Sequence, residues 1–245
     1  MRLGLCQVDS QWENRIRTRE RIAKIFDAWD SRVDCLIFPE MGLSGFSMNR
    51  KATSLDMDDH EFFFEIASRL KTIVLYGGVE EGFNCIFSVD SRGVRKTEYR
   101  KRHLFSYGDE DKSYLAGTDS ALVDICGMKF ALAICYDLRF PYHFWENAKA
   151  VDGFIVIASW PENRREHWSS LLRARAIENL AYVVGVNRVG KDPALSYSGD
   201  SAVYGPFGER HLECGPSEGV FCCEINPSRT AEIRAAYHFI EDRKQ

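Results

Sequence analysis

The sequence predicts an α/β fold in which helices cover the faces of a mixed sheet. Three observations lead to this prediction. Short apolar runs typical of buried strands alternate along the chain with helix-periodic, amphipathic segments. Several strand-like segments follow one another across turn residues, as hairpins do. The 245 residues show no repeat, linker or low-complexity segment. We therefore expect a single domain over residues 1–245, with residues 226–245 as a C-terminal arm.

The expected elements follow from these patterns in chain order. Helices are predicted over 12–29, 61–70, 141–150 and 164–181, with a terminal helix or arm over 229–243. Strands are predicted over 2–8, 33–38, 72–79, 83–89, 94–99, 122–126, 129–134, 153–158, 182–189, 202–204, 210–212 and 220–225. Segment 106–118 is polar and contains glycine, so we expect a loop there.

Composition excludes several classes of protein. The net charge of −4 argues against a nucleic-acid surface, and no apolar stretch reaches membrane-spanning length. The N-terminus has no signal-peptide layout. The eight cysteines form no Cys-x-x-Cys pair and lie mostly in apolar runs, which favours free thiols and a cytoplasmic location. No two of the six histidines are four residues apart, so we expect neither a metal nor another cofactor.

Cys135 occupies the most informative position in the chain. The apolar run 130–134 stops abruptly at this cysteine, polar residues follow, and Pro141 suits the first turn of a helix. A cysteine at such a corner can hold its sulfur out of the core, where the next amides can donate hydrogen bonds. The alternative is a small buried cysteine that packs as a hydrophobe.

Two further reactive side chains also lie just after a predicted strand. Glu40 follows the strand 33–38, and Lys101 follows the strand 94–99. We expect both to meet Cys135 at one edge of one sheet. A free thiol has a pKa of about 8.5 and needs a base. Glu40 can accept its proton, and Lys101 can favour the thiolate and stabilise an oxyanion. Alternatively, Glu40 is a surface acid and Lys101 belongs to a solvated basic run.

Three motifs that contain these residues resemble those of the nitrilase, or carbon–nitrogen hydrolase, superfamily. They are Leu36-Ile37-Phe38-Pro39-Glu40, Tyr99-Arg100-Lys101-Arg102-His103-Leu104-Phe105 and Ile134-Cys135-Tyr136-Asp137-Leu138-Arg139-Phe140-Pro141. Their order and separation are similar to those of the family's Glu–Lys–Cys triad, and the resemblance extends over essentially the whole chain. It implies a four-layer α-β-β-α sandwich and a homodimer in which sheet-covering helices meet.

The resemblance also implies a role for each residue. Glu40 would be the general base, Lys101 the oxyanion stabiliser and Cys135 the nucleophile. The amide N–H of Tyr136 would be the second oxyanion donor. Glu110 would match the family's second glutamate and orient the substrate and Lys101, although a solvated loop acid is the alternative at that position.

Within the superfamily, further segments resemble the omega-amidase group, which hydrolyses the terminal amide of 2-oxo acid amides such as 2-oxoglutaramate or 2-oxosuccinamate. These segments are 44–48, 160–161, 167–168, 173–179, 185–190 and 198–201. Ser159 departs from the group, where asparagine often precedes Trp-Pro, and this bears on the substrate. Trp160 is expected either to wall the substrate pocket or to belong to the core.

The resulting hypothesis is a metal-free cysteine amidase that acts on a small-molecule amide. A 2-oxo acid carries a carboxylate that needs a cationic partner, for which Arg139, Arg164 and Arg165 are candidates. One alternative is the same chemistry on an N-carbamoyl amino acid or a simple aliphatic amide. Another is a catalytically silent scaffold with the same fold.

Overall fold

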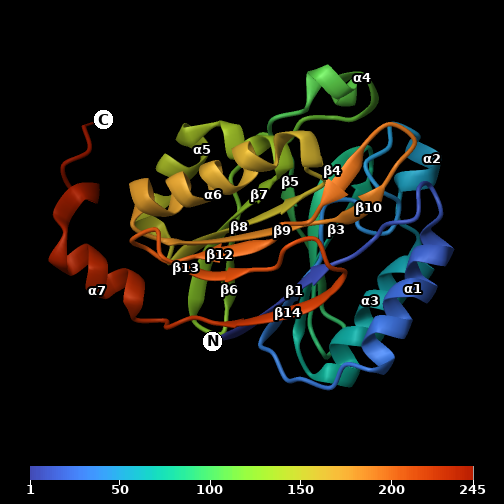
Figure 1. The fold of residues 1–245 in the computed structure, drawn as a ribbon, viewed down its shortest axis with the longest axis horizontal. Helices are drawn as coiled ribbons and strands as arrows, with labels where there is room; N and C mark the ends of the chain where they lie inside the picture. The colour runs from blue at the N-terminus through green and yellow to red at the C-terminus, as the bar shows by residue number, and fades with distance from the viewer. Residues whose placement is uncertain (245) are drawn as a thin grey trace.

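A computed structural model describes residues 1–244 and contains two six-stranded mixed sheets (Figure 1). The first sheet has the order β14-β1-β2-β3-β4-β5 and the second the order β13-β12-β9-β8-β7-β6. In the first sheet β1, β2 and β3 run parallel, and in the second β7, β8 and β9 do. The remaining neighbours within each sheet are antiparallel, as the predicted hairpins require.

The strand bounds agree closely with the predicted runs. The first sheet contains β1 (Arg2–Gln7), β2 (Cys35–Ile37), β3 (Ile73–Glu80), β4 (Phe83–Val89), β5 (Arg95–Arg100) and β14 (Gly219–Glu224). The second contains β6 (Leu122–Ile125), β7 (Met128–Ile134), β8 (Gly153–Ala158), β9 (Tyr182–Asn187), β12 (Ala202–Tyr204) and β13 (Arg210–Glu213). Every residue of β8 and β9 is buried, because both faces of these central strands are covered.

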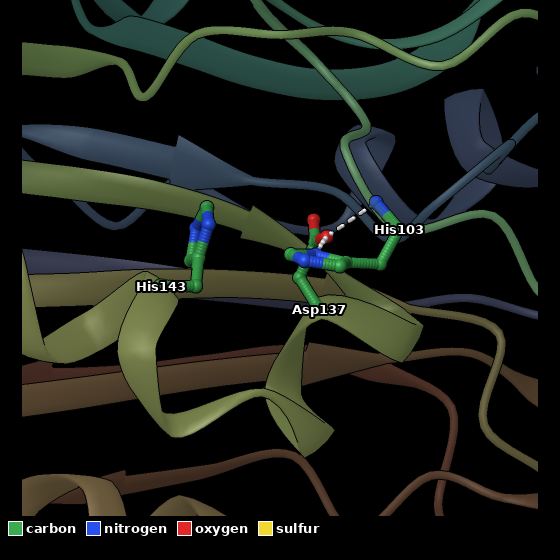
Figure 2. Close-up of side chains that lie close together, drawn as sticks. All are labelled: His103, Asp137 and His143. Carbon is green, nitrogen blue, oxygen red and sulfur yellow. Dashed lines mark hydrogen bonds and ion pairs between the residues drawn. The ribbon is translucent and has the colours of Figure 1, made fainter.

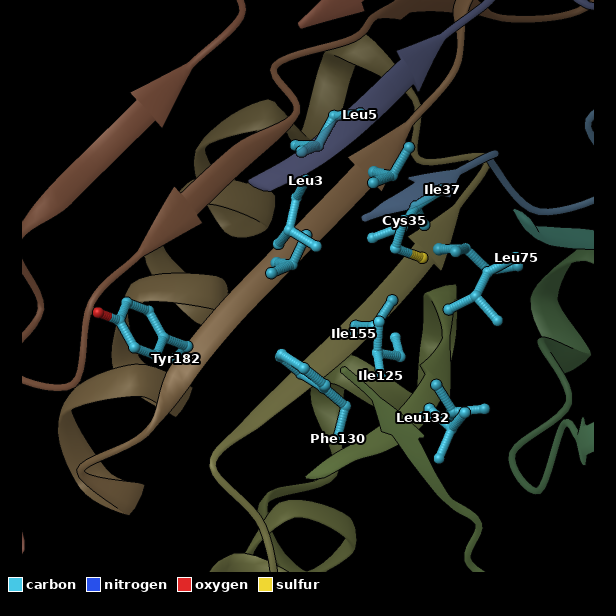
Figure 3. Close-up of a cluster of buried hydrophobic side chains, with 14 of the residues drawn as sticks. Leu3, Leu5, Cys35, Ile37, Leu75, Ile125, Phe130, Leu132, Ile155 and Tyr182 are labelled. Carbon is cyan, nitrogen blue, oxygen red and sulfur yellow. The ribbon is translucent and has the colours of Figure 1, made fainter. Parts of the chain in front are cut away.

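Three apolar clusters define four layers. The cluster between the sheets joins side chains of both, such as Leu3 and Leu5 of β1 with Phe130 and Leu132 of β7 (Figure 3). The helices α1 (Arg15–Asp27) and α3 (Met57–Leu70) pack on the outer face of the first sheet. The helices α5 (Pro141–Trp145) and α6 (Arg165–Asn179) pack on the outer face of the second. The predicted α-β-β-α sandwich is therefore confirmed.

Local capping explains where two helices begin. The Asn14 side chain accepts a hydrogen bond from the Arg17 amide, so α1 starts at Arg15 rather than at residue 12. Asp56 and Asp59 form a capping box, and α3 therefore begins at Met57, earlier than predicted. Within residues 1–244, none of the helices combines the length and apolar character needed to cross a bilayer.

The prediction of a loop over 106–118 was partly wrong. The segment contains a 3-10 turn (Ser106–Gly108) and a short helix, α4 (Glu110–Ser113). Asp109 between them has a left-handed backbone with φ of 58°. The segment is anchored because the buried Tyr114 hydroxyl donates a 2.5 Å hydrogen bond to the Ser47 carbonyl. Polar composition correctly marks such a segment as irregular but does not reveal this anchor.

Three short elements were not predicted. The helix α2 (Arg50–Thr53) lies in the segment after β2, and β10 (Val189–Lys191) pairs with β11 (Ser196–Ser198) in a separate hairpin. The arm contains α7 (Arg229–Ala236) and a 3-10 turn (His238–Ile240), so its helix is shorter than predicted. Arg234 holds the arm against the second sheet's helical layer by donating to the carbonyls of Val151, Asn179 and Leu180.

Candidate active site

Cys135 lies at a sharp corner between a strand and a helix, as predicted. Strand β7 ends at Ile134, a 3-10 helix spans Cys135–Arg139, and α5 then begins with Pro141. Cys135 has a φ of 46°, a left-handed backbone that is strained for a residue with a side chain. Its side chain lines a cavity, whereas Cys6 and Cys35 are fully buried in apolar clusters. Cys135 is therefore placed differently from those two cysteines.

The Lys101 amine lies between two carboxylates. Its Nζ donates to Glu40 Oε1 at 2.8 Å and to Glu110 Oε1 and Oε2 at 3.0 and 2.9 Å. All three side chains are completely buried. Neither of the surface alternatives considered for Glu40 and Lys101 describes this geometry, and Glu110 is not a solvated loop acid.

The elements that supply these groups differ from the prediction in one respect. Glu40 and Lys101 follow β2 and β5 of the first sheet, but Cys135 follows β7 of the second. The expectation that they meet at one edge of one sheet was therefore wrong. The apolar runs indicated where each strand ends but contained no information about which sheet it joins. The site lies where the ends of two packed sheets face each other.

Two further residues hold the glutamates in place: Asn84, which had no predicted role, and Ser159, which was expected only to bear on the substrate. The buried Asn84 of β4 donates from Nδ2 to Glu40 Oε1 at 2.8 Å and to Glu110 Oε1 at 2.9 Å. The Ser159 amide donates to Glu40 Oε2 at 2.9 Å, and the Ser159 hydroxyl to the Glu40 carbonyl at 3.0 Å. A lone asparagine within the apolar strand 83–89 was the available signal for Asn84, since buried amides need partners.

Burial and charge shift the pKa values in this cluster. Burial disfavours the charged form of Lys101, but attraction to Glu110 and Glu40 outweighs it and raises the pKa of the amine. Burial raises the pKa of Glu110, and Lys101 only partly offsets this. Burial and the Glu40 charge raise the pKa of the Cys135 thiol well above its usual range, and the Lys101 charge only partly opposes this. The resting sulfur is therefore protonated and depends on a base.

The cavity beside Cys135 has a volume of about 570 Å³, within the range of small-molecule sites. Trp160, Arg139 and Arg164 line it, and Trp160 is also only 3 % exposed within the outer apolar cluster. Trp160 therefore lines the cavity and belongs to the core at the same time, and its contact with a substrate stays a prediction. The Arg139 guanidinium lies 4.8 Å from the centre of a Trp160 ring, and that of Arg164 lies 5.6 Å from the Phe105 ring centre.

The three candidate arginines differ in their partners. Arg165 is not among the lining residues and forms an ion pair with Asp200 at 2.8 Å. Within residues 1–244, neither Arg139 nor Arg164 forms an ion pair with a carboxylate. These two cations therefore face the cavity without a bound counter-charge from the described chain. Tyr136, the second residue of the 3-10 helix, also lines the cavity.

A second polar cluster lies behind Cys135. His103, Asp137 and His143 each contribute one nitrogen or oxygen atom that could bind a metal, and these three atoms lie within 4.8 Å of one another (Figure 2). The expectation of no metal site relied on the absence of helical histidine spacing. These two histidines are brought together by the fold from separate segments, which spacing could not reveal.

The four-layer sandwich and the family match define a class of enzyme. Residues 2–235 match the carbon-nitrogen hydrolase family, so the chain belongs to this family. It is a hydrolase that acts on carbon–nitrogen bonds other than peptide bonds. XC1258 from Xanthomonas campestris, a CN-hydrolase superfamily protein whose structure has an arsenic adduct in the active site, has a TM-score of 0.93 to this structure. It is 32% identical, and the match covers 100% of this chain and 97% of that chain.

Two relatives are similar in more particular terms. Omega-amidase YafV of Escherichia coli (strain K12) is 40% identical over 182 residues, which is 72% of this chain and 70% of the relative. The 2-oxoglutaramate amidase of Bacillus subtilis (strain 168) is 31% identical over 218 residues, covering 85% of this chain and 84% of the relative. These similarities confirm the predicted resemblance to the omega-amidase group and support amidase activity of the carbon–nitrogen hydrolase type.

Proposed function

We propose that this protein is a cysteine-dependent amidase that hydrolyses the terminal amide of a small 2-oxo acid amide to the acid and ammonia. The substrate would be 2-oxoglutaramate or 2-oxosuccinamate. The observation that carries the proposal is the buried Lys101 amine, held between Glu40 and Glu110. Cys135, whose thiol is influenced by these charges, lines a cavity with two arginines that have no ion pair among residues 1–244. The names of the relatives support the same substrate class.

In the proposed mechanism Glu40 takes the proton of the Cys135 thiol as the sulfur attacks the amide carbonyl. Lys101 and the Tyr136 N–H donate to the tetrahedral oxyanion. Glu40 then gives its proton to the departing nitrogen, ammonia leaves, and a thioester remains on Cys135. Glu40 next removes a proton from water, whose oxygen attacks the thioester carbonyl, and the protonated sulfur is restored as the acid departs.

The raised pKa values fit these roles. Because attraction to Glu110 and Glu40 raises the pKa of Lys101, the amine stays cationic at neutral pH and can stabilise the oxyanion. Because the pKa of Cys135 is raised, proton transfer to Glu40 must accompany attack rather than precede it. Glu110 accepts two hydrogen bonds from the Lys101 amine and would keep the amine aimed at the substrate.

A panel of amides with ammonia as the readout tests the substrate proposal. The account predicts that kcat/KM is highest for 2-oxoglutaramate or 2-oxosuccinamate and much lower for glutamine. Preference for an N-carbamoyl amino acid or for a neutral aliphatic amide such as butyramide would contradict the substrate class but retain the chemistry. Ammonia release from none of these compounds would favour the alternative of a catalytically silent scaffold.

Replacing Arg139 and Arg164 by glutamine is expected to weaken binding of the substrate carboxylate. Each charge-assisted hydrogen bond contributes about 1.5–3 kcal/mol, so KM for 2-oxoglutaramate should rise by about 10-fold or more for either variant. Arg165→Gln is the matched control, because Arg165 pairs with Asp200 instead of lining the cavity. Steady-state kinetics with 2-oxoglutaramate and butyramide check this. A double variant with an unchanged KM for the anionic substrate would exclude these arginines as its anchor.

Replacing Asn84 by alanine is expected to move the acid limb of the pH profile. Burial already raises the pKa of Glu110, and the Asn84 hydrogen bond partly opposes that rise. Without this bond the pKa rises further, Glu110 takes up a proton earlier as the pH falls, and Lys101 loses a counter-charge. The fall in kcat/KM should then begin about one pH unit higher.

A pH–rate profile from pH 4 to 9 measures this shift. Asn147→Ala is the matched control, because Asn147 is also buried but donates to the His143 carbonyl outside the glutamate cluster. The same acid limb in Asn84→Ala as in the parent would show that Asn84 does not tune the glutamates.

We further propose that the protein forms a homodimer and acts in the cytoplasm. Large apolar side chains on α5, α6 and the arm are exposed, among them Trp145, Ile177 and Phe239, and a second copy would cover them. Light scattering tests the stoichiometry. All eight cysteines are free thiols, which is compatible with a reducing compartment.

A further inference from the structure

The Asp137 carboxylate accepts four hydrogen bonds that join two parts of the candidate site. Oδ2 accepts from the Ile134 amide at 2.9 Å and from the Tyr99 hydroxyl at 2.8 Å. Oδ1 accepts from the His103 amide at 3.0 Å and from His103 Nδ1 at 2.6 Å. Ile134 directly precedes Cys135, while Tyr99 and His103 lie two residues on either side of Lys101.

We propose that Asp137 is a positioning residue that fixes the Lys101 amine relative to the Cys135 sulfur, an inference that rests on the proposed function. The turn that carries Cys135 belongs to the second sheet, and the segment that carries Lys101 leaves the first. The Asp137 carboxylate binds both segments at once. It therefore joins the two sheets at the point where nucleophile and oxyanion donor must keep a constant separation.

The His103 ring provides a second link between the same segments. Its Nδ1 lies against Asp137, and its Nε2 lies 2.6 Å from the Tyr142 hydroxyl (Figure 2 shows the first of these contacts). In the neutral ring, Nδ1–H donates to the carboxylate and Nε2 accepts from the hydroxyl. The ring also stacks on Phe140, with centroids 4.0 Å apart. Phe140 and Tyr142 both follow the Cys135 turn, so the ring cannot rotate away from Asp137 without breaking these contacts.

Burial of the Asp137 charge makes these contacts necessary. The side chain is completely buried and, within residues 1–244, has no ion pair with a lysine or arginine. A buried carboxylate without partners is strongly unfavourable. Here burial would raise its pKa, but the hydrogen bonds from His103 and the Ile134 amide, with the nearby charge of Lys101, help to lower it. The ionised group is therefore stable only where the two segments supply its donors together.

The cluster of His103, Asp137 and His143 is better suited to hold Asp137 by hydrogen bonds than to bind a metal ion. His143 Nε2 lies 2.9 Å from the Leu132 carbonyl and must donate to it, so Nδ1 is its only free nitrogen. The Arg102 guanidinium lies 3.5 Å from that Nδ1 and would repel a cation. Each Asp137 oxygen already accepts two hydrogen bonds. A metal would have to displace these donors, so the geometry favours a hydrogen-bonded link between the two segments over a metal site.

Asp137→Asn is the main test, and Asp59→Asn is its matched control. Asp59 is equally buried, but its carboxylate pairs with Arg15 and Arg19 and lies in α3 on the outer face of the first sheet. Misplacing a catalytic group by about 1 Å costs on the order of 10²-fold in rate. We expect Asp137→Asn to lower kcat by about that factor with a much smaller change in KM. Asp59→Asn should lower the unfolding midpoint and leave kcat of the folded protein unchanged.

A second pair of variants keeps the test informative if Asp137→Asn does not fold. His103→Asn retains an amide N–H near the position of Nδ1, whereas His103→Gln places its amide further out, near Nε2. We expect His103→Asn to keep several-fold more of the parent kcat than His103→Gln. Equal activity of the two variants would contradict a role for the Asp137–His103 contact.

Alkylation of Cys135 by iodoacetamide provides a readout that needs no substrate. Asp137→Asn should slow it several-fold, because Lys101 and Glu40 no longer assist the sulfur, and Asp59→Asn should not. This readout separates failure of the inference from failure of the proposed amide substrate. Parent-like kcat and alkylation in folded Asp137→Asn would overturn the inference. The inference would also be overturned if the purified parent protein contained one equivalent of metal and the Asp137→Asn variant did not.

Discussion

Replacing Cys135 by alanine is expected to abolish ammonia release from 2-oxoglutaramate. The proposed thioester cannot form without the sulfur, and removing a nucleophile from a cooperating group of catalytic residues costs about 10⁶-fold in kcat. The fold should persist, since Cys135 already lies at the edge of the cavity and the Asp137 hydrogen bonds to the turn do not involve its side chain. Ammonia release and circular dichroism of the purified variant measure both outcomes.

Cys126→Ala is the control for this experiment. Cys126 is an exposed free thiol at the turn between β6 and β7 and does not line the cavity. Its loss should leave kcat and KM unchanged. Ammonia release by Cys135→Ala at the parent rate would contradict the mechanism, because no other cysteine lines the cavity among residues 1–244.

Replacing Lys101 by methionine is expected to reduce both activity and stability. Loss of one oxyanion donor costs about 10²–10³-fold in kcat. The substitution also leaves Glu40 and Glu110 buried together without their shared cation. Removing one partner of a buried pair costs about 3–5 kcal/mol in the free energy of unfolding. Urea unfolding and ammonia release measure the two effects separately.

The double variant Lys101→Met/Glu110→Gln separates them further. It removes one buried negative charge, so part of the lost unfolding free energy should return while activity stays low. Lys112→Met is the control, because the Lys112–Asp109 pair is exposed and contributes little. Parent-like kcat in Lys101→Met would exclude Lys101 as an oxyanion donor.

The contribution of Lys101 to the free energy of unfolding depends on pH in one direction. The pKa of Lys101 is raised in the folded protein, whereas an unfolded lysine has a pKa of about 10.4. The stabilisation by Lys101 is therefore fully present below about pH 10 and is lost only as the pH rises through the higher folded value. The Lys101 charge itself should accordingly add no pH dependence to the unfolding free energy of the parent between pH 7 and about pH 9.

Local patterns were sufficient to predict most elements of the fold. The apolar runs that form β7 and β8 are short and bounded by polar or turn residues, and each forms a largely buried strand with nearly the predicted bounds. Pro141 begins α5 as expected, because its fixed φ suits the first turn of a helix. The motif around Cys135 was informative for the same reason, since strand, corner and helix follow one another directly in the chain.

Features that depend on distant segments could not be predicted in this way. Asn84 contacts Glu40, which is 44 residues away, and Asp137 contacts Tyr99 at a separation of 38 residues. Neither contact leaves a periodic pattern in the sequence. The choice of sheet for β7 is set by packing of the central apolar cluster and is equally non-local. Three arginines could be named as candidates, but only the structure shows that Arg165 pairs with Asp200 and does not line the cavity.

Site-resolved alkylation tests the central claim most directly. The parent protein is treated with limiting iodoacetamide, with and without 2-oxoglutaramate, and peptide mapping is compared with residual ammonia release. The account predicts that activity falls in proportion to alkylation of Cys135, independently of the exposed Cys126, and that substrate slows both. Full activity in protein whose Cys135 is completely alkylated would contradict it.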